Sequence, residues 1–119
     1  MEISEGQVWK YKTRDIESSS EVRVIKVDEI GVHISMNNLK IKNPDAPNGF
    51  SAEVSHIPME LEHFQASVIE LLRTEKEFED DYLSGYNSWH HQLMNDGDVG
   101  YFTIQISDAI KYMEEALNQ

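Results

Sequence analysis

Five histidines in this chain could hold a metal ion or transfer a proton. His56 and His63 lie seven residues apart with a proline between them, while His90 and His91 are adjacent. Adjacent side chains on a helix point about 100° apart, so the last two cannot both face one ion. No H-E-x-x-H or comparable ligand spacing occurs. The sequence predicts no metal, although a fold that gathered His56, His63 and Glu60 would keep that possibility open.

The motifs of nucleophilic and cofactor-dependent catalysis are also missing. The chain contains no cysteine, no G-x-S-x-G motif and no glycine-rich phosphate loop. The stretch "DGDVG", residues 96–100, is superficially similar to a calcium loop, but it lacks the alternating oxygen ligands and the distal glutamate. We interpret it as a turn. We therefore expect no catalytic residue and no cofactor, and an enzyme is the less favoured class of protein.

One group of polar residues could bind an anion if the fold brings them together. A cleft between a β-sheet and the proline-rich loop 43–50 would gather two lysines and two histidines: His33, Lys40, Lys42 and His56. The alternative is that these side chains are simply solvated on the open face of a sheet. Both interpretations stay open.

A second group of candidates combines acids with aromatic residues. The stretch "TEKEFEDD", residues 74–81, holds five acids in eight residues and precedes a segment rich in tyrosine and tryptophan. Exposed aromatics with a charged rim are typical of protein interfaces. The candidate partner-binding residues are Glu79, Asp80, Asp81, Tyr82, Tyr86 and Trp89. Alternatively, most of the aromatics, Trp9 and Tyr11 included, fill the core.

The formal net charge of -12 is unevenly distributed. Residues 1–43 contain seven basic and seven acidic residues, whereas residues 44–119 contain three basic and fifteen acidic ones. Such a chain repels phosphate backbones, so we expect no nucleic-acid partner. The acidic half is either a solvated surface or a surface that docks on a basic protein.

The length of 119 residues predicts a single domain over residues 1–119. The apolar runs are far shorter than the roughly 18 residues that a membrane span needs. The N-terminal stretch "MEISEGQVWKYK" lacks the basic and apolar regions of a secretion signal. The absence of cysteine fits a reducing compartment. We therefore expect a cytoplasmic protein with no membrane partner.

The elements that must position these residues begin with strands. Segments 6–13, 21–30 and 32–41 predict a three-stranded meander. In the third, apolar and polar residues alternate as in a half-exposed antiparallel strand: Val32, Ile34 and Met36 against His33, Ser35 and Asn37. The loop 43–50, with its prolines and Asn-Gly pair, predicts an ordered corner. Residues 52–57 could form a short fourth strand that ends at Pro58.

Helices dominate the remainder of the chain. Apolar residues recur at helical spacing in 60–73 and in 81–94. Residues 101–106 predict a returning strand, and Ser107 is placed to cap a last helix with its apolar side inward at Ile110, Met113 and Leu117. The predicted fold class is α+β, an antiparallel sheet of the N-terminal meander plus one or two later strands, packed against about three helices.

Four blocks of the sequence, "GQVWKYKTR", "LKIKNP", "SHIP" and "GYFTIQISDAI", resemble the recurring blocks of a family of small uncharacterised bacterial proteins. The resemblance covers residues 6 to about 112. It implies a bacterial, single-domain α+β protein with no established activity. It carries over no catalytic residue.

Together these observations favour a non-enzymatic protein with an acidic surface that binds another macromolecule. An immunity-like role toward a basic partner, such as a cationic toxin, would suit the charge pattern. The alternative is a small enzyme or metabolite-binding protein with a site between the sheet, the 43–50 loop and the first helix. A homo-oligomer formed through the apolar surface of the sheet is a further possibility.

Overall fold

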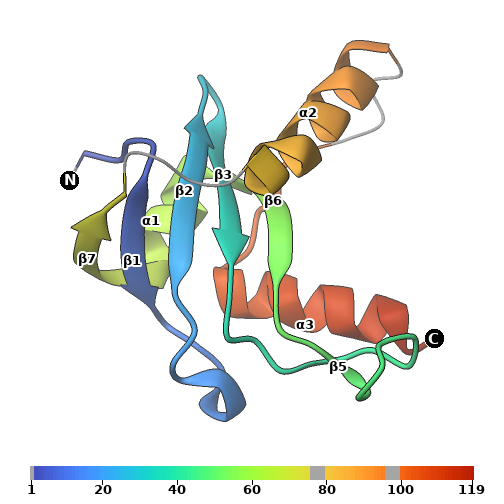
Figure 1. The fold of residues 1–119 in the computed structure, drawn as a ribbon. Helices are drawn as coiled ribbons and strands as arrows, with labels where there is room; N and C mark the ends of the chain where they lie inside the picture. Colours follow the sequence, from blue (N-terminus) through green and yellow to red (C-terminus); the bar gives the residue numbers. More distant parts are fainter. Residues whose placement is uncertain (1, 76–79, 96–99) are drawn as a thin grey trace.

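Five antiparallel strands form the central sheet in a computed structural model that describes residues 2–75, 80–95 and 100–119 (Figure 1). The strands lie in the order β6-β3-β2-β1-β7, and every neighbouring pair is antiparallel. Their bounds are Gln7–Tyr11 for β1, Val22–Val27 for β2, Gly31–Met36 for β3, Val54–Glu60 for β6 and Val68–Thr74 for β7. Together with the helices, this sheet confirms the predicted α+β class.

The N-terminal meander β1-β2-β3 is as predicted. A single 3-10 turn, η1 at Asp15–Glu17, lies between β1 and β2. The turn between β2 and β3 is closed by Asp28, whose carboxylate accepts hydrogen bonds from the backbone N–H groups of Ile30 and Gly31 at 2.9 and 2.8 Å. A short polar side chain that binds its own backbone in this way stabilises a tight reversal of the chain. The register that follows places Val24 opposite Ile34.

The proline-rich stretch after β3 is an ordered hairpin at the end of the sheet far from α2 (Figure 1). It pairs β4, Ile41–Lys42, with β5, Phe50–Ser51, in a separate two-stranded sheet. The N–H of Asn43 donates to the carbonyl of Gly49 at 2.9 Å, and Gly49 has a φ of +83° that favours glycine. The stretch supplies a corner, as predicted.

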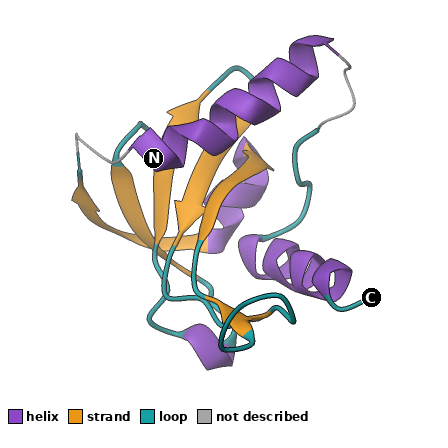
Figure 2. Ribbon diagram, turned by 45° about the vertical axis from the view of Figure 1, so that its right-hand side comes forward, coloured by secondary structure: helices purple, strands orange, loops and turns teal. Residues whose placement is uncertain are grey.

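Helices cover both faces of the sheet (Figure 2). The short α1, Leu61–Ser67, and the longer α3, Ile106–Leu117, pack on one face. The third helix, α2 at Asp80–Asn95, crosses the other face at the end where β2 turns into β3. Within the described ranges, no helix combines the length and the apolar character that a bilayer crossing requires.

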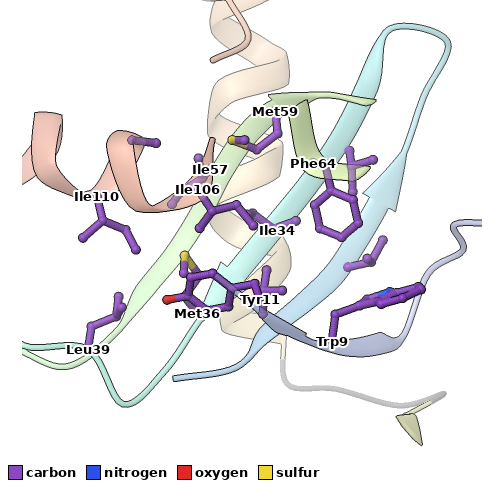
Figure 3. Packing of buried hydrophobic residues seen from close by; sticks show 14 of the residues in the cluster. Trp9, Tyr11, Ile34, Met36, Leu39, Ile57, Met59, Phe64, Ile106 and Ile110 are labelled. Atoms are coloured by element: carbon purple, nitrogen blue, oxygen red, sulfur yellow. The ribbon is translucent and has the colours of Figure 1, made fainter. Parts of the chain in front are cut away.

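The hydrophobic core lies between the sheet and the helices α1 and α3 (Figure 3). The strands contribute Tyr11, Ile34 and Met59, and the helices contribute Phe64 and Ile110, all of them almost completely buried. Removing such apolar side chains from water stabilises the fold by roughly 1.5–3 kcal/mol each. The core therefore fixes one face of each central strand and leaves the opposite face for α2.

The prediction of a half-exposed third strand is only partly correct. The alternation holds, because Ile34 and Met36 lie in the core and His33 and Ser35 point to the other face. However, His33 and Ser35 are also buried, with 0% and 1% of their surface exposed. Helix α2 packs over His33, a contact between distant segments that the local pattern does not reveal.

The prediction that the fourth strand ends at Pro58 is wrong, because β6 continues to Glu60. Pro58 lies on an outer strand, and its carbonyl accepts the N–H of Phe102 at 2.8 Å on the side away from β3. The proline nitrogen faces the same side, so the ladder with β3 loses no donor.

The prediction of a helix over residues 60–73 is wrong for the second half of that range. Helix α1 ends at Ser67, and Val68–Thr74 form the strand β7 alongside β1. The stretch contains the β-branched pair Val68 and Ile69, and β1 offers an open edge next to it. Pairing with that edge outweighs the helical spacing of the leucines.

The predicted strand at residues 101–106 is reduced to one isolated bridge between Met59 and Phe102. Helix α3 begins at Ile106, so Ser107 lies in its first turn and is not its cap. The N–H of Ile106 donates instead to the hydroxyl of Ser67 at 3.0 Å. At the far end of α3, Leu117 is 43% exposed and does not point inward as predicted.

Candidate functional site

Two histidines meet on the sheet face that α2 covers. In the antiparallel register of β3 and β6, His33 lies opposite Pro58, so His56 is its diagonal neighbour on the same face. Their nitrogens His33 Nδ1 and His56 Nε2 are 2.8 Å apart. The rings are nearly parallel, at 11°, and their centroids are 5.1 Å apart, so they meet edge to edge through this bond.

A carboxylate and a phenol complete the polar chain. Asp28, in the turn between β2 and β3, lies 2.7 Å from His33 Nε2 through its Oδ2. The same oxygen accepts a hydrogen bond from the hydroxyl of Tyr101 at 2.5 Å. The side chains Tyr101, Asp28, His33 and His56 thus form one continuous chain from the segment before α3 to β6. We call these four residues the histidine relay.

The environment of the histidine relay keeps Asp28 ionised. Burial by itself would raise the pKa of this carboxyl group, but hydrogen bonds from Tyr101, His33 and the turn backbone outweigh it and lower the pKa to about 2. Burial raises the pKa of the Tyr101 hydroxyl, and the neighbouring carboxylate raises it further. Tyr101 is therefore a hydrogen-bond donor at all ordinary pH values.

Burial has the opposite effect on the imidazoles, because it disfavours their charged form. It lowers the pKa of His56 to about 4, and the neighbouring His33 adds to the shift. The pKa of His33 is also lowered by burial, although the hydrogen bond to Asp28 opposes the shift. At neutral pH both rings are therefore neutral.

Aromatic side chains of α2 cover the two imidazoles. The ring centroids of Tyr86 and Trp89 each lie 4.7 Å from that of His33, and both rings meet it edge-on. The helix comes this close because residue 85 is glycine: a Cβ atom there would lie 2.7 Å from the Cβ of His56. Trp89 is 8% exposed, and its Nε1 has no hydrogen-bond partner within the described structure.

The histidine relay can hold and move protons, but its chemistry does not by itself define a reaction. A neutral His56 backed by His33 and Asp28 can accept a proton at Nδ1. Two cavities have volumes of about 380 and 440 Å³; Tyr101 is the one relay residue that lines either of them, and it lines the first. The first is formed by residues 100–104 with Tyr112, and the second by the 39–52 hairpin region.

The four candidate anion-binding residues do not meet in one place. His33 and His56 lie under α2, bonded directly to each other, and the Asp28 carboxylate bonded to His33 would repel an anion. Lys40 and Lys42 belong to the hairpin region, where their backbone N–H groups bind the carboxylates of Glu17 and Glu114. Of the four residues, only Lys40 lines a cavity described above.

The candidate acidic and aromatic patch is resolved only in part. Glu79 lies outside the described residues, and so do the side chains of Asp80, Asp81 and Tyr82. Of the remaining two, Tyr86 is half-buried and Trp89 is buried against His33. Trp89 thus belongs to the contact between α2 and the sheet and is not an exposed anchor.

Sequence reasoning missed Asp28 and Tyr101. Asp28 lies three residues before Gly31, a pattern that indicates a turn. Nothing in the local sequence indicates that it would bind a histidine. Tyr101 is separated from Asp28 by 73 positions, so no local pattern could join them. A metal-ligand arrangement of Glu60 and His63 was considered, and the structure does place them together with Glu62, within 4.8 Å, but without His56.

The outermost strand presents a second candidate site. No described strand pairs with the outer edge of β7, and three of its apolar side chains are exposed: Ile69 by 56%, Leu71 by 44% and Leu72 by 39%. The register with β1 shifts twice, leaving Ile69 and Leu72 without a partner residue. Such bulges make an outer edge irregular and hinder the addition of a further regular strand.

No family model, no curated protein and no solved structure matches this chain. The class that the fold defines is therefore a general one, an α+β domain with helices on both faces of an antiparallel sheet. The resemblance to small bacterial proteins stays a prediction.

Proposed function

We propose that this protein is a non-enzymatic binding protein that docks a positively charged protein through strand β7. The observation that carries the proposal is the exposure of Ile69, Leu71 and Leu72 on a single outer strand. Exposed apolar side chains gathered on one element are typical of interaction sites. A cationic toxin is one example of a partner with the required charge.

The charge around β7 supports a basic partner. Arg73, the only basic residue of the strand, is already neutralised by Glu21 and Glu75, at 2.9 Å each. Glu70 is exposed, and the run of five acids in residues 74–81 follows directly along the chain. A net charge of -12 would also attract a cationic partner over a distance and speed its association.

The shape of β7 indicates side-chain docking as the mode of binding. Its two register shifts interrupt the edge on which a partner strand would have to pair. An apolar centre with carboxylates around it matches the common plan of a protein interface, in which the centre supplies most of the affinity.

The test is a capture experiment with matched variants. Wild-type protein, Leu71→Glu and Met94→Glu are immobilised, exposed to lysate of the native host, and eluted with increasing salt before mass spectrometry. Met94 is 71% exposed on α2, so its variant adds the same charge away from β7. We expect a basic protein that is retained by wild type and Met94→Glu, lost by Leu71→Glu, and released between about 0.05 and 1 M salt as screening increases.

Equal retention by all three proteins would contradict docking on β7. Light scattering of the same variants adds a second outcome: a concentration-dependent dimer that Leu71→Glu abolishes would assign β7 to contact between copies of this chain.

One observation favours a second candidate function, metabolite binding at the hairpin. The cavity of about 440 Å³ is lined by three apolar side chains, one cation and one amide: Leu39, Phe50, Ala52, Lys40 and Asn48. Apolar walls with few polar groups are typical of small-molecule sites. A thermal-shift screen of anionic metabolites would support this function if a stabilising compound lost its effect in Lys40→Ala but not in Lys12→Ala.

A further inference from the structure

The histidine pair lies in the contact that attaches α2 to the sheet. His33 touches Tyr86 and Trp89, and His56 lies 6.0 and 5.8 Å from the same two rings. Gly85 packs directly against His56. The main core, by contrast, lies on the other face with α1 and α3. A change in the pair would therefore act on α2 before it acts on the core.

The hydrogen bonds around the pair determine one arrangement of protons. Asp28 is ionised and can only accept, so His33 carries its proton on Nε2 and has a free lone pair on Nδ1. His56 must then donate from Nε2 to His33 Nδ1. The remaining nitrogen, His56 Nδ1, is the position that can take up another proton.

A proton added to this pair has little to compensate it. Asp28 is bonded to the far side of His33, so it does not contact the charge that this proton places on His56, and a second proton would place two cations with their nitrogens 2.8 Å apart. The groups that α2 and β2 bring near are a phenol and two basic side chains. His90 lies 5.7 Å from the ring of Tyr86, and Lys26 Nζ lies 5.9 Å from that ring. Among the side chains that the structure describes, the titratable groups named around the pair are thus Asp28, Tyr101, Tyr86, His90 and Lys26.

We propose that the protonation state of the His33–His56 pair controls whether α2 stays packed on the sheet. The neutral pair holds α2 in place, and a proton taken up in mildly acidic solution releases the helix while the core remains folded. The buried Trp89 N–H, which has no hydrogen-bond partner in the described structure, already weakens this contact. This inference is independent of docking on β7.

The direction of the pH effect follows from linkage. The pKa of His56 is about 4 with α2 in place and returns toward 6.5 when the helix leaves and water reaches the ring. The open form therefore binds more protons between these values, and falling pH favours it. The attachment of α2 is complete above about pH 6.5 and is lost progressively toward pH 4.

The experiment is amide hydrogen exchange between pH 7.5 and 4.5, corrected for the intrinsic pH dependence of exchange. We expect the protection of amides in α2 to fall on the order of 50-fold over this range, while amides of β2 and β3 keep theirs. His56→Gln can still donate to His33 but cannot take up the proton, so its α2 protection should not change with pH. His63→Gln, a partly exposed histidine on α1, should behave as wild type.

Equal loss of protection in α2 and in the core strands would overturn the proposal. So would a loss of α2 protection at low pH in His56→Gln that is as large as in wild type. A test on the wild-type protein alone covers the case in which His56→Gln does not fold. NMR signals of the two imidazoles should titrate with the same midpoint as the loss of α2 protection. A midpoint that differs by more than about one pH unit would also overturn the proposal.

Discussion

At the scale of single residues, the Asp28 carboxylate makes more hydrogen bonds than any other side chain of the histidine relay. Its two oxygens accept from His33, Tyr101 and the backbone of Ile30 and Gly31. Removing the carboxylate leaves the buried His33 N–H and the part-buried Gly31 amide without an acceptor, whereas the exposed Ile30 amide can bond to water. Each unsatisfied buried group costs about 1–3 kcal/mol.

We therefore predict that Asp28→Ala lowers the free energy of unfolding by at least about 2 kcal/mol. Urea denaturation followed by circular dichroism measures the change. Glu29→Ala is the matched control, since Glu29 is an exposed acid in the same turn and should change stability by less than about 0.5 kcal/mol. Similar values for the two variants would show that the relay does not stabilise the fold.

Arg14 and Glu17 form a second buried polar group. Glu17 has a fully buried side chain, and its carboxylate binds the guanidinium of Arg14 at 2.6 Å and the N–H of Lys40 at 2.8 Å. Arg14 also reaches Glu114 on α3, at 3.0 Å. The pair therefore joins the 3-10 turn, the hairpin region and the last helix.

Because Arg14→Ala leaves the Glu17 carboxylate buried without its counter-charge, we predict a loss of about 3–5 kcal/mol in the free energy of unfolding. Arg73→Ala is the control, because that guanidinium is about half exposed and its ion pairs should contribute no more than about 1 kcal/mol. Thermal and urea denaturation of both variants would compare them. A loss for Arg14→Ala no larger than for Arg73→Ala would refute the assignment.

At the scale of elements, the packing of α2 on β6 depends on the absence of a side chain at residue 85. In an open helix position, Gly→Ala stabilises by about 1 kcal/mol. Here the added methyl group would lie 2.7 Å from the Cβ of His56 and 3.3 Å from the hydroxyl of Ser55. The same substitution must push the helix away from the strand.

We predict that Gly85→Ala destabilises the protein by about 1–3 kcal/mol despite the gain in helix propensity. Asn87→Ala, at an exposed position of the same helix, should be neutral or slightly stabilising. Chemical denaturation with Trp89 fluorescence, in a Trp9→Phe background, reports on both. Stabilisation by Gly85→Ala would mean that α2 is not held in close contact with β6.

At the scale of the whole molecule, the net charge of -12 opposes folding, because the compact state brings the acids together. Raising the ionic strength from 0.01 to 0.1 M shortens the Debye length from about 30 to about 10 Å. We predict that the urea midpoint rises over this range. A neutral solute at the same osmolality serves as the control, and a falling midpoint would show that ion pairs such as Arg73 with Glu21 outweigh the excess of acids.

The sequence by itself determined which strands, turns and helices form more than which of them pack together. Alternation in 21–36 predicted β2 and β3, and the turn formers in 43–50 predicted the corner, since both depend on neighbours along the chain. The apolar period in 81–94 predicted α2 for the same reason. His33 and His56 were selected as candidates on residue type alone, and the structure joins them by a hydrogen bond.

The tertiary structure decided everything that depends on which segments meet. Residues 68–74 became a strand because β1 had an open edge, although their spacing also suited a helix. Asp28 and Tyr101 became partners because the chain returns to the β2–β3 turn after α2. His33 was buried by Tyr86 and Trp89 of α2, more than fifty positions away, and this burial lowers its pKa. Such contacts are chosen by the packing of the whole chain, which no local pattern encodes.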